Sequence, residues 1–322
     1  MQKPRVYITR VLPAKGMQLI QDHCQMEVWP DELPPSREEI LTRVPGVAGI
    51  LSLLTDKIDA EVMKAAGSQL RVISNYAVGY NNIDIKAATE RGIAVGNTPG
   101  ILTDATADFA FALMLTVGRR ILEAARTVRS GQWQTWGPSI LLGSDFVGAT
   151  LGLIGFGRIG HAMAKRASGF DMRVLYSDAG AEPAYDAKAA HLDTLLRESD
   201  FISLHVPLTA DTHHLISTSA FEKMKSNAIL INTARGEIVD PAALYDALKN
   251  RRIFGAALDV TEPEPLPMDS PLLELDNLII CPHIASASVI TRENMAIKAV
   301  QNLLAGIRGE PLPNIVNPQI YE

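Results

Sequence analysis

Residues 151–160 read Leu-Gly-Leu-Ile-Gly-Phe-Gly-Arg-Ile-Gly, and Asp178 follows the last of these glycines by eighteen residues. The first four residues are apolar or small, which predicts a short buried strand. The later glycines predict a tight turn into a helix, because apolar residues recur at helical spacing up to Ala167. A further strand over residues 172–176 ends just before the acid. This order of strand, turn, helix, strand and acid is typical of a dinucleotide-binding site.

Each glycine of this motif has its own physical purpose. Gly155 permits the tight turn, Gly157 lets the backbone approach a pyrophosphate, and Gly160 lets the helix pack closely on the strand. The start of the helix offers free N–H groups and a positive dipole end to the phosphates. The residues between the glycines are therefore expected at the cofactor as well: Phe156, Arg158 and Ile159.

Asp178 bears on which dinucleotide binds. A carboxylate at this place can accept hydrogen bonds from the ribose hydroxyls and would repel a 2′-phosphate. The next residues, Ala179 and Gly180, provide no positive charge for such a phosphate. We therefore expect NAD(H) in preference to NADP(H).

The composition excludes several classes of protein. The length of 322 residues corresponds to about two domains. The net charge is −6 and no Lys/Arg cluster stands out, so neither nucleic acid nor an anionic membrane is an expected partner. Cys24 and Cys281 lie far apart, which fits a reducing cytoplasm better than a disulfide framework. We expect no signal peptide, no membrane-spanning helix and no metal site.

Two blocks of alternating strand and helix signals predict an α/β protein with two doubly wound parallel sheets. The first block has strand-like segments at 6–9, 26–28, 49–53, 72–75 and 93–95. The second has them at 151–154, 172–176, 201–204, 228–231, 256–258 and 278–280.

Two long helices are expected to connect the blocks. A helix over residues 103–129 would span roughly 40 Å, and its many apolar residues suggest a dimer contact. A second helix over 289–307 precedes a proline-rich tail that we expect to pack on the first block. The predicted domains are 1–100 with 287–322, and 101–286, which begins with the helix 103–129.

Three polar side chains follow successive strands of the second block: Arg235, Glu264 and His283. In doubly wound sheets, ligands bind at the carboxyl ends of the strands. An arginine there can bind a carboxylate through two parallel hydrogen bonds. A histidine, which titrates near pH 6.5, can deliver a proton at cellular pH, and a neighbouring carboxylate orients its ring. Together with a nicotinamide, which supplies a hydride, this set fits reduction of a 2-keto acid.

Over essentially its whole length the chain resembles the D-isomer-specific 2-hydroxyacid dehydrogenase family. The resemblance rests on four motifs, at residues 155–160, 232–236, 259–265 and 282–284. It implies a Rossmann NAD-binding domain inserted into a flavodoxin-like substrate domain. It also implies that Arg235 binds substrate, that His283 is the acid/base and that Glu264 is its acid partner. Glu262 is the alternative acid, but the family's acid lies five residues after Asp259, which favours Glu264.

The resemblance implies further contacts. Backbone N–H groups of Val78 and Gly79 would hold the substrate carboxylate. Leu53 and Leu54 end another predicted strand, so we expect them to form an apolar wall of the same site. His205 is the main competitor of His283, and we expect it to line the cofactor crevice, whereas His213 and His214 are expected to be solvated. Further residues are predicted at the cofactor: Thr103, Val206, Pro207, Thr212, Thr233, Ala234, Arg235, Asp259, His283 and Ala285.

Within the family, the glyoxylate/hydroxypyruvate reductase branch is most similar, through residues 133–138 and 259–267. In that branch a tryptophan matching Trp136 reaches the active site of the neighbouring subunit, which implies a homodimer. Two alternatives stay open: a D-lactate or other 2-hydroxyacid dehydrogenase, and a corepressor that senses NAD.

Overall fold

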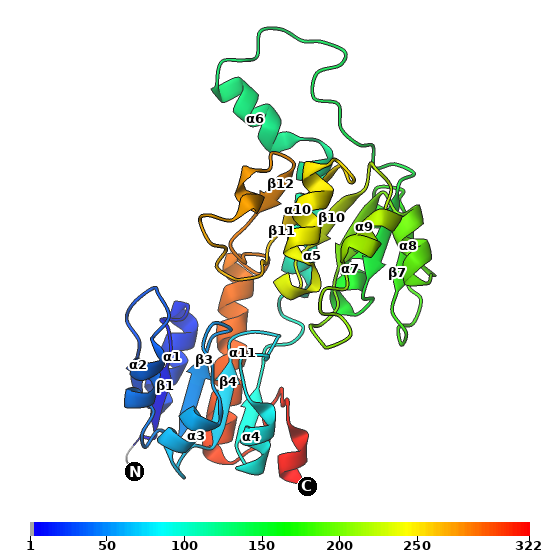
Figure 1. Ribbon diagram of the computed structural model, residues 1–322. Helices are drawn as coiled ribbons and strands as arrows, with labels where there is room; N and C mark the ends of the chain where they lie inside the picture. Colours follow the sequence, from blue (N-terminus) through cyan, green and yellow to red (C-terminus); the bar gives the residue numbers. More distant parts are fainter. Residues whose placement is uncertain (1–2) are drawn as a thin grey trace. The chain divides into compact units, whose positions relative to one another are not determined.

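The computed structural model describes residues 3–322, which form two compact units. One unit comprises the chain up to Leu102 together with Ala287–Glu322, and the other comprises Thr103–Ser286. Each unit is a parallel sheet with helices on both faces (Figure 1). Within the described residues, no helix is both long and apolar enough to cross a membrane.

The first unit contains a five-stranded sheet in the order β2-β1-β3-β4-β5, which is the flavodoxin-like order. One face is covered by the helices α1 (Ala14–His23) and α11 (Val289–Arg308), and the other by α2 (Arg37–Arg43), α3 (Ala60–Ala66) and α4 (Ile85–Glu90). The strands are β1 (Arg5–Ile8), β2 (Gln25–Val28), β3 (Gly49–Ser52), β4 (Val72–Asn75) and β5 (Ala94–Gly96).

The C-terminal tail packs on this unit, as predicted. The backbone N–H of Val316 donates to the carbonyl of Val95 at 2.7 Å. The buried side chain of Asn317 accepts from the N–H of Val95 at 2.8 Å and donates to the carbonyl of Ile93 at 2.9 Å. These bonds satisfy the free edge of β5, which would otherwise expose unpaired backbone groups.

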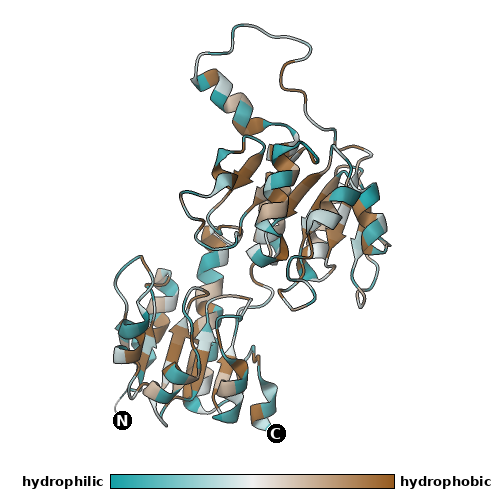
Figure 2. Cartoon of the chain, in the orientation of Figure 1, coloured by the Kyte–Doolittle hydropathy of each residue, from teal (hydrophilic) through white to brown (hydrophobic). Residues whose placement is uncertain are grey.

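The second unit contains a seven-stranded sheet in the order β12-β11-β10-β9-β6-β7-β8. The glycine motif follows β6, which lies next to the central strand β9, and this is the arrangement of a Rossmann fold. The strands β6, β9, β10 and β11 are buried along their whole length because both faces of the sheet are covered (Figure 2). The strands are β6 (Thr150–Ile154), β7 (Arg173–Ser177), β8 (Lys188–Ala189), β9 (Phe201–Leu204), β10 (Ile229–Asn232), β11 (Gly255–Leu258) and β12 (Leu278–Ile280).

Helices cover this sheet in two groups. On one face α5 (Thr103–Gly118) packs with α7 (Arg158–Ser168), and together they form one apolar core with the sheet. On the other face α8 (Leu192–Glu198), α9 (Thr218–Lys223) and α10 (Pro241–Lys249) form a second core. The sheet is thus packed on both faces, and this packing fixes the strand ends from which the loops begin.

The prediction of one helix over 103–129 was wrong. The segment forms two helices, α5 and α6 (Ile121–Arg129). Arg120 lies between them with φ of 52°, which a right-handed helix does not permit. The carbonyl of Gly118 accepts from the N–H of Ser144 at 2.8 Å, so a later loop replaces the continuing helix.

Candidate active site

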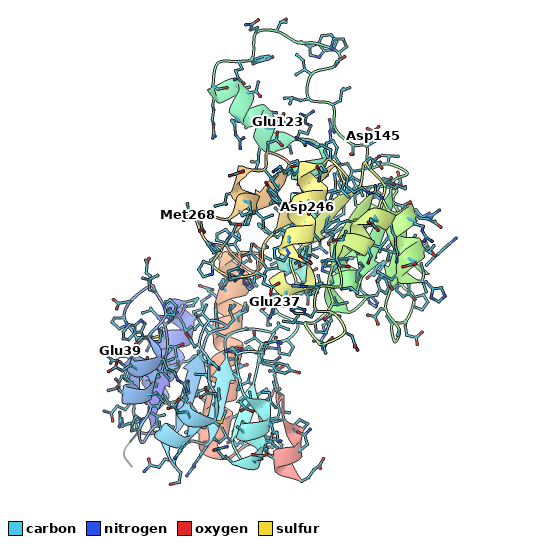
Figure 3. The ribbon with its side chains drawn as sticks, in the orientation of Figure 1. Glu39, Glu123, Asp145, Glu237, Asp246 and Met268 are labelled. Atoms are coloured by element: carbon cyan, nitrogen blue, oxygen red, sulfur yellow. The ribbon has the colours of Figure 1, made fainter. Side chains whose placement is uncertain are left out.

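The polar residues predicted from the sequence gather at the carboxyl edge of the seven-stranded sheet. The strands β10, β11 and β12 are neighbours, and their register pairs Asn232 with Leu258 and Leu258 with Ile280. The loops that follow these three strands contain Arg235, Glu264 and His283. Glu237, which Figure 3 labels, lies in the short 3-10 helix Gly236–Ile238 that follows Arg235. The sheet therefore brings three predicted residues to one edge.

His283 and Glu264 form a direct pair. The Nδ1 atom of His283 lies 2.6 Å from Oε1 of Glu264. Because an ionised carboxylate only accepts hydrogen bonds, Nδ1–H is the donor and Nε2 faces away from the carboxylate. Burial raises the pKa of Glu264, but the hydrogen bond and charge of His283, with the charge of Arg235, hold this pKa below its ordinary value. Glu264 is thus kept ionised beside the imidazole.

The backbone around His283 is fixed by Asp259, a buried residue at the end of β11. Its carboxylate accepts from the N–H groups of Ile284 at 2.8 Å and Ala285 at 2.7 Å. Its carbonyl accepts from the N–H of His283 at 2.9 Å. His283 has φ of 55°, which is uncommon outside glycine. Asp259 therefore holds a turn that few side chains adopt and so orients the imidazole.

Arg235 follows β10 and is held by Asn232, a residue to which the sequence analysis gave no function. The buried amide of Asn232 donates to the carbonyl of Arg235 at 2.7 Å and accepts from the N–H of Ala234 at 3.0 Å. Burial lowers the pKa of the Arg235 guanidinium, while Glu264 and Glu237 oppose this shift. Arginine stays charged at any ordinary pH. A polar residue at the end of a buried apolar strand was the signal for Asn232.

The glycine loop has the backbone geometry that a dinucleotide requires. Gly155 has φ of 92°, and a Cβ built there would lie 2.6 Å from the carbonyl carbon of His205. A Cβ on Gly160 would lie 2.5 Å from the carbonyl oxygen of Gly155. Among the described residues, nothing lies within 4 Å of a Cβ built on Gly157, so this residue leaves open space at the start of α7. Phe156, between Gly155 and Gly157, is buried and stacks on Tyr176.

Asp178 lies at the end of β7, where the motif places it. One carboxylate oxygen accepts from the N–H of Phe156 at 2.8 Å, and the other accepts from the N–H of Gly180 at 3.2 Å. The carboxylate thus connects the glycine loop to the next strand. Arg158 and Ile159 form the first turn of α7.

The loop after β9 supplies the other predicted cofactor residues. His205 Nε2 lies 2.9 Å from the hydroxyl of Ser203, and burial lowers the pKa of His205 to about 3, so its ring stays neutral. Thr212 braces the loop by donating to the carbonyl of Pro207 at 2.7 Å. Val206 is half-buried beside them.

The hydroxyl of Thr233, at the end of β10, has no hydrogen-bond partner among residues 3–322 although the side chain is buried. A buried hydroxyl without a partner at this edge, together with the free space at Gly157, fits a bound nicotinamide dinucleotide. Thr103, also predicted, begins α5.

Glu262 and Glu264 have different partners. Glu264 pairs with His283, whereas Glu262 Oε2 lies 2.7 Å from Nε2 of His214. The expectation that His214 is solvated was wrong, because the loop after β9 folds its ring against the loop after β11. His213 is half exposed and stacks on His214 with 4.0 Å between the ring centroids.

The predicted substrate residues of the first unit follow two strands of its sheet. Leu54 comes after β3, and Val78 and Gly79 come after β4. Asn82 donates to the carbonyl of Leu53 at 2.9 Å, and Asn75 donates to that of Gly79 at 2.8 Å. These amides hold the two loops in place within this unit.

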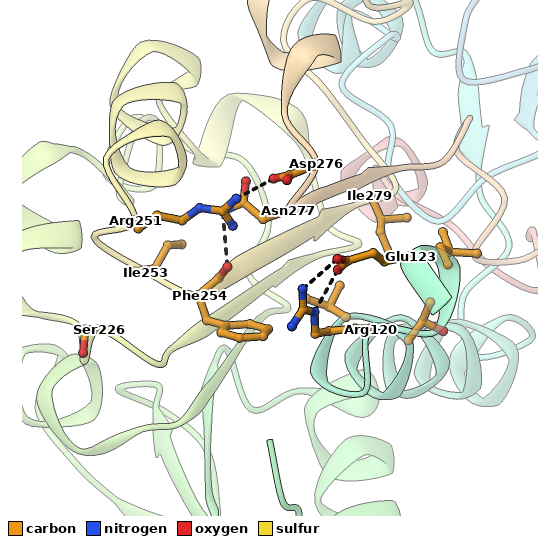
Figure 4. Close-up of a pocket in the computed structure, with 12 residues that line it drawn as sticks. Arg120, Glu123, Ser226, Arg251, Ile253, Phe254, Asp276, Asn277 and Ile279 are labelled. Atoms are coloured by element: carbon orange, nitrogen blue, oxygen red, sulfur yellow. Dashed lines mark hydrogen bonds and ion pairs between the residues drawn. The ribbon is translucent and has the colours of Figure 1, made fainter. Parts of the chain in front are cut away.

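A pocket of about 330 Å³ lies at the opposite edge of the seven-stranded sheet. It is bounded by the end of α5, by α6 and by the residues before β11 and β12 (Figure 4). Two ion pairs flank it, Arg120 with Glu123 and Arg251 with Asp276, each at 2.7 Å. None of the predicted catalytic residues lines this pocket.

Comparison with known proteins identifies the family. Residues 111–285 match the family model described as D-isomer specific 2-hydroxyacid dehydrogenase, NAD binding domain. The chain belongs to this family. It is 52% identical to a glyoxylate reductase of Korarchaeum cryptofilum over 99% of this chain and 98% of that protein. It is 49% identical to a glyoxylate reductase of Thermococcus litoralis, over 99% and 98% of the two chains.

Solved structures also support the membership of this chain in the dehydrogenase family. The TT0316 protein from Thermus thermophilus matches with a TM-score of 0.93 and 48% identity, covering 97% of this chain and 99% of that one. An NADPH-dependent glyoxylate/hydroxypyruvate reductase from Sinorhizobium meliloti matches with a TM-score of 0.86 and 31% identity, covering 98% and 97%. The dehydrogenase is thus an oxidoreductase that acts on CH–OH groups. It uses a nicotinamide cofactor, and its substrate is a small keto or hydroxy acid.

Proposed function

We propose that this dehydrogenase reduces glyoxylate and hydroxypyruvate to the corresponding 2-hydroxy acids with NADH, in the cytoplasm. The observation that supports this most is the Glu264–His283 pair at the same sheet edge as Arg235. Glyoxylate reductases at about half identity over the full chain favour these substrates. The relatives do not favour the alternatives, a D-lactate dehydrogenase and a corepressor.

Each polar side chain has one task in this proposal. Arg235 binds the substrate carboxylate through its planar guanidinium and polarises the adjacent carbonyl. His283 gives the proton from Nε2 to the carbonyl oxygen, since Nδ1–H is engaged by Glu264. Glu264 stabilises the protonated imidazole before the transfer. The nicotinamide, when bound, supplies the hydride.

We further propose that residues 1–100 with 287–322 form the substrate domain and 101–286 the NAD-binding domain. Leu54, Val78 and Gly79 are proposed as substrate contacts on the family resemblance. The proposed cofactor contacts are the glycine loop and the residues from the loops after β9 to β12.

The preference for NADH over NADPH is part of the proposal. Asp178 would lie beside a 2′-phosphate, and two like charges at close range cost several kcal/mol. We expect kcat/KM to be about 100-fold higher with NADH than with NADPH. A kinetic panel of glyoxylate, hydroxypyruvate, pyruvate and phenylpyruvate, each with both cofactors, measures this. Comparable values for the two cofactors would contradict the role of Asp178, and no NADH oxidation with any acid would contradict the function.

A homodimer is proposed from the segment 121–147. The amphipathic helix α6 has no buried residue, and the segment exposes many large apolar side chains. Such patches on a single chain mark interfaces. The exposed residues are Ile121, Leu122, Val128, Trp133, Trp136, Ile140, Leu142 and Val147. The side chain of Trp136 is proposed to reach the partner's substrate site, on the family resemblance.

Light scattering is expected to give a mass of about twice 34.9 kDa at micromolar concentration. The double variant Ile121→Asp/Leu122→Asp is expected to shift the mass toward the monomer, because it places two charges in the apolar interface. Leu33→Asp, which changes an exposed apolar residue of the first unit outside this segment, is the control. A monomeric wild type would contradict the dimer.

A further inference from the structure

Two loops at the carboxyl edge of the seven-stranded sheet are joined by one side-chain hydrogen bond. His214 lies in the loop after β9, Glu262 lies in the loop after β11, and their side chains meet at 2.7 Å. The strand β10 lies between β9 and β11 in the sheet. The pair therefore reaches across the loop after β10, which contains Arg235.

The loop after β10 is enclosed on both sides. On the β9 side, the N–H of His214 donates to the carbonyl of Glu237 at 2.8 Å, and Ile216 forms a parallel bridge with Val239. On the β11 side, a Cβ on Gly236 would lie only 2.0 Å from the carbonyl oxygen of Thr261. The segment just after Arg235 is thus held between the two loops that the His214–Glu262 hydrogen bond joins.

His214 has a strained backbone, with φ of 50°. Such a conformation costs free energy in a residue other than glycine and persists only where surrounding contacts hold it. Here the conformation turns the ring of His214 toward Glu262, with His213 stacked on the same side. The residue with the strained backbone is thus the one that makes the hydrogen bond to Glu262.

Glu262 is coupled closely to Glu264. Only Pro263 separates them, and the proline ring fixes φ of that residue. The hydroxyl of Thr261 donates to the carbonyl of Pro263 at 2.8 Å, which stiffens the same turn. A shift of Glu262 must therefore move Glu264, and with it the hydrogen bond to His283.

We propose that His214 is a positioning residue, which acts through Glu262 to keep Arg235 and Glu264 at fixed positions relative to each other. The proposal rests on the proposed function of those two residues. It gives a separate role to Glu262, which the sequence analysis considered as the alternative acid partner of His283. His214 itself contacts neither substrate nor cofactor in this proposal.

A bound divalent cation is the competing explanation. The ligand atoms of His213, His214 and Glu262 all lie within 4.8 Å of one another. We favour the direct pair because His214 and Glu262 already share a normal hydrogen bond, whereas Nε2 of His213 lies 4.0 Å from the carboxylate. A chelator distinguishes the two explanations.

The test compares His214→Ala with His213→Ala, its stacked neighbour, as the matched control. We expect His214→Ala to lower kcat/KM for glyoxylate about 10- to 100-fold, with a higher KM and a lower kcat, because small misplacements of catalytic groups are costly. The Kd for NADH should stay within about twofold of wild type. Glu262→Ala should behave like His214→Ala, because either variant removes the hydrogen bond, and the double variant should lose no more than either single one. His213→Ala should match wild type, and EDTA should leave wild-type activity unchanged.

Amide hydrogen exchange gives a readout that does not depend on turnover. Residues 235–240 and 259–265 should exchange faster in His214→Ala but not in His213→Ala. This measurement tests the His214–Glu262 hydrogen bond even if wild type reduces none of the keto acids, a result that would instead overturn the proposed function. Unchanged exchange in His214→Ala, unchanged kcat/KM, a parallel loss of NADH affinity, or inactivation of wild type by EDTA would each overturn the positioning role.

Discussion

His283→Ala is expected to lower kcat for glyoxylate reduction about 1000-fold while the Kd for NADH stays within about twofold of wild type. The reason is that Nε2 is the proposed proton donor, whereas the glycine loop and Asp178, which are proposed to bind the dinucleotide, are unchanged. The backbone turn should survive, because Asp259 holds it through main-chain N–H groups and not through the imidazole. Steady-state kinetics and a fluorescence titration with NADH measure the two quantities.

Two further variants sharpen this result. Glu264→Gln keeps an oxygen that can accept from Nδ1 but removes the charge, so we expect a smaller loss of about 10- to 100-fold. His191→Ala, an exposed histidine of the same unit, is the matched control and should retain wild-type kinetics. If His283→Ala kept full turnover, another group would have to supply the proton.

Arg235→Ala is expected to raise KM for glyoxylate about 100-fold, with a smaller effect on kcat. Loss of one partner of a charged pair costs about 2–5 kcal/mol, and about 2.7 kcal/mol corresponds to that factor. Arg235→Lys should recover only part of the affinity, because an ammonium group cannot bind a carboxylate in the planar two-bond geometry. The measurement is KM for the keto acid beside the Kd for NADH.

Two outcomes would contradict the proposed role of Arg235 in binding the substrate carboxylate. A KM unchanged in Arg235→Ala would mean that the substrate carboxylate is bound elsewhere. An equal loss of NADH affinity would mean that the variant has disturbed the loop after β10, which Asn232 and Gly236 otherwise hold.

The sequence predicted the features that depend on local pattern. The strand and turn at 151–160, the apolar strands of both sheets and the family membership follow from motifs of a few residues, and all were confirmed. The end of the helix at Gly118 was not predictable, because it depends on Ser144, which occupies the Gly118 carbonyl from a separate loop. Helical periodicity continues through the break and gives no sign of it.

The partners of the two glutamates depend on sheet order, which local pattern does not contain. Glu262 and His214 are 48 residues apart in the chain and meet only because β9, β10 and β11 are neighbours. His213 and His214 looked like solvated residues in a polar loop for the same reason. Asn232 was visible as a polar residue after a buried strand, but its two backbone bonds required the folded turn.

The carboxylate of Asp178 has a consequence for attempts to change the proposed cofactor preference. The group proposed to repel a 2′-phosphate also accepts the N–H of Phe156 and so anchors the glycine turn. One side chain would therefore both select the cofactor and hold the backbone of the glycine turn. A substitution that merely deletes the negative charge would loosen the turn for both coenzymes, so a useful exchange must keep an acceptor oxygen at position 178 while it removes the charge.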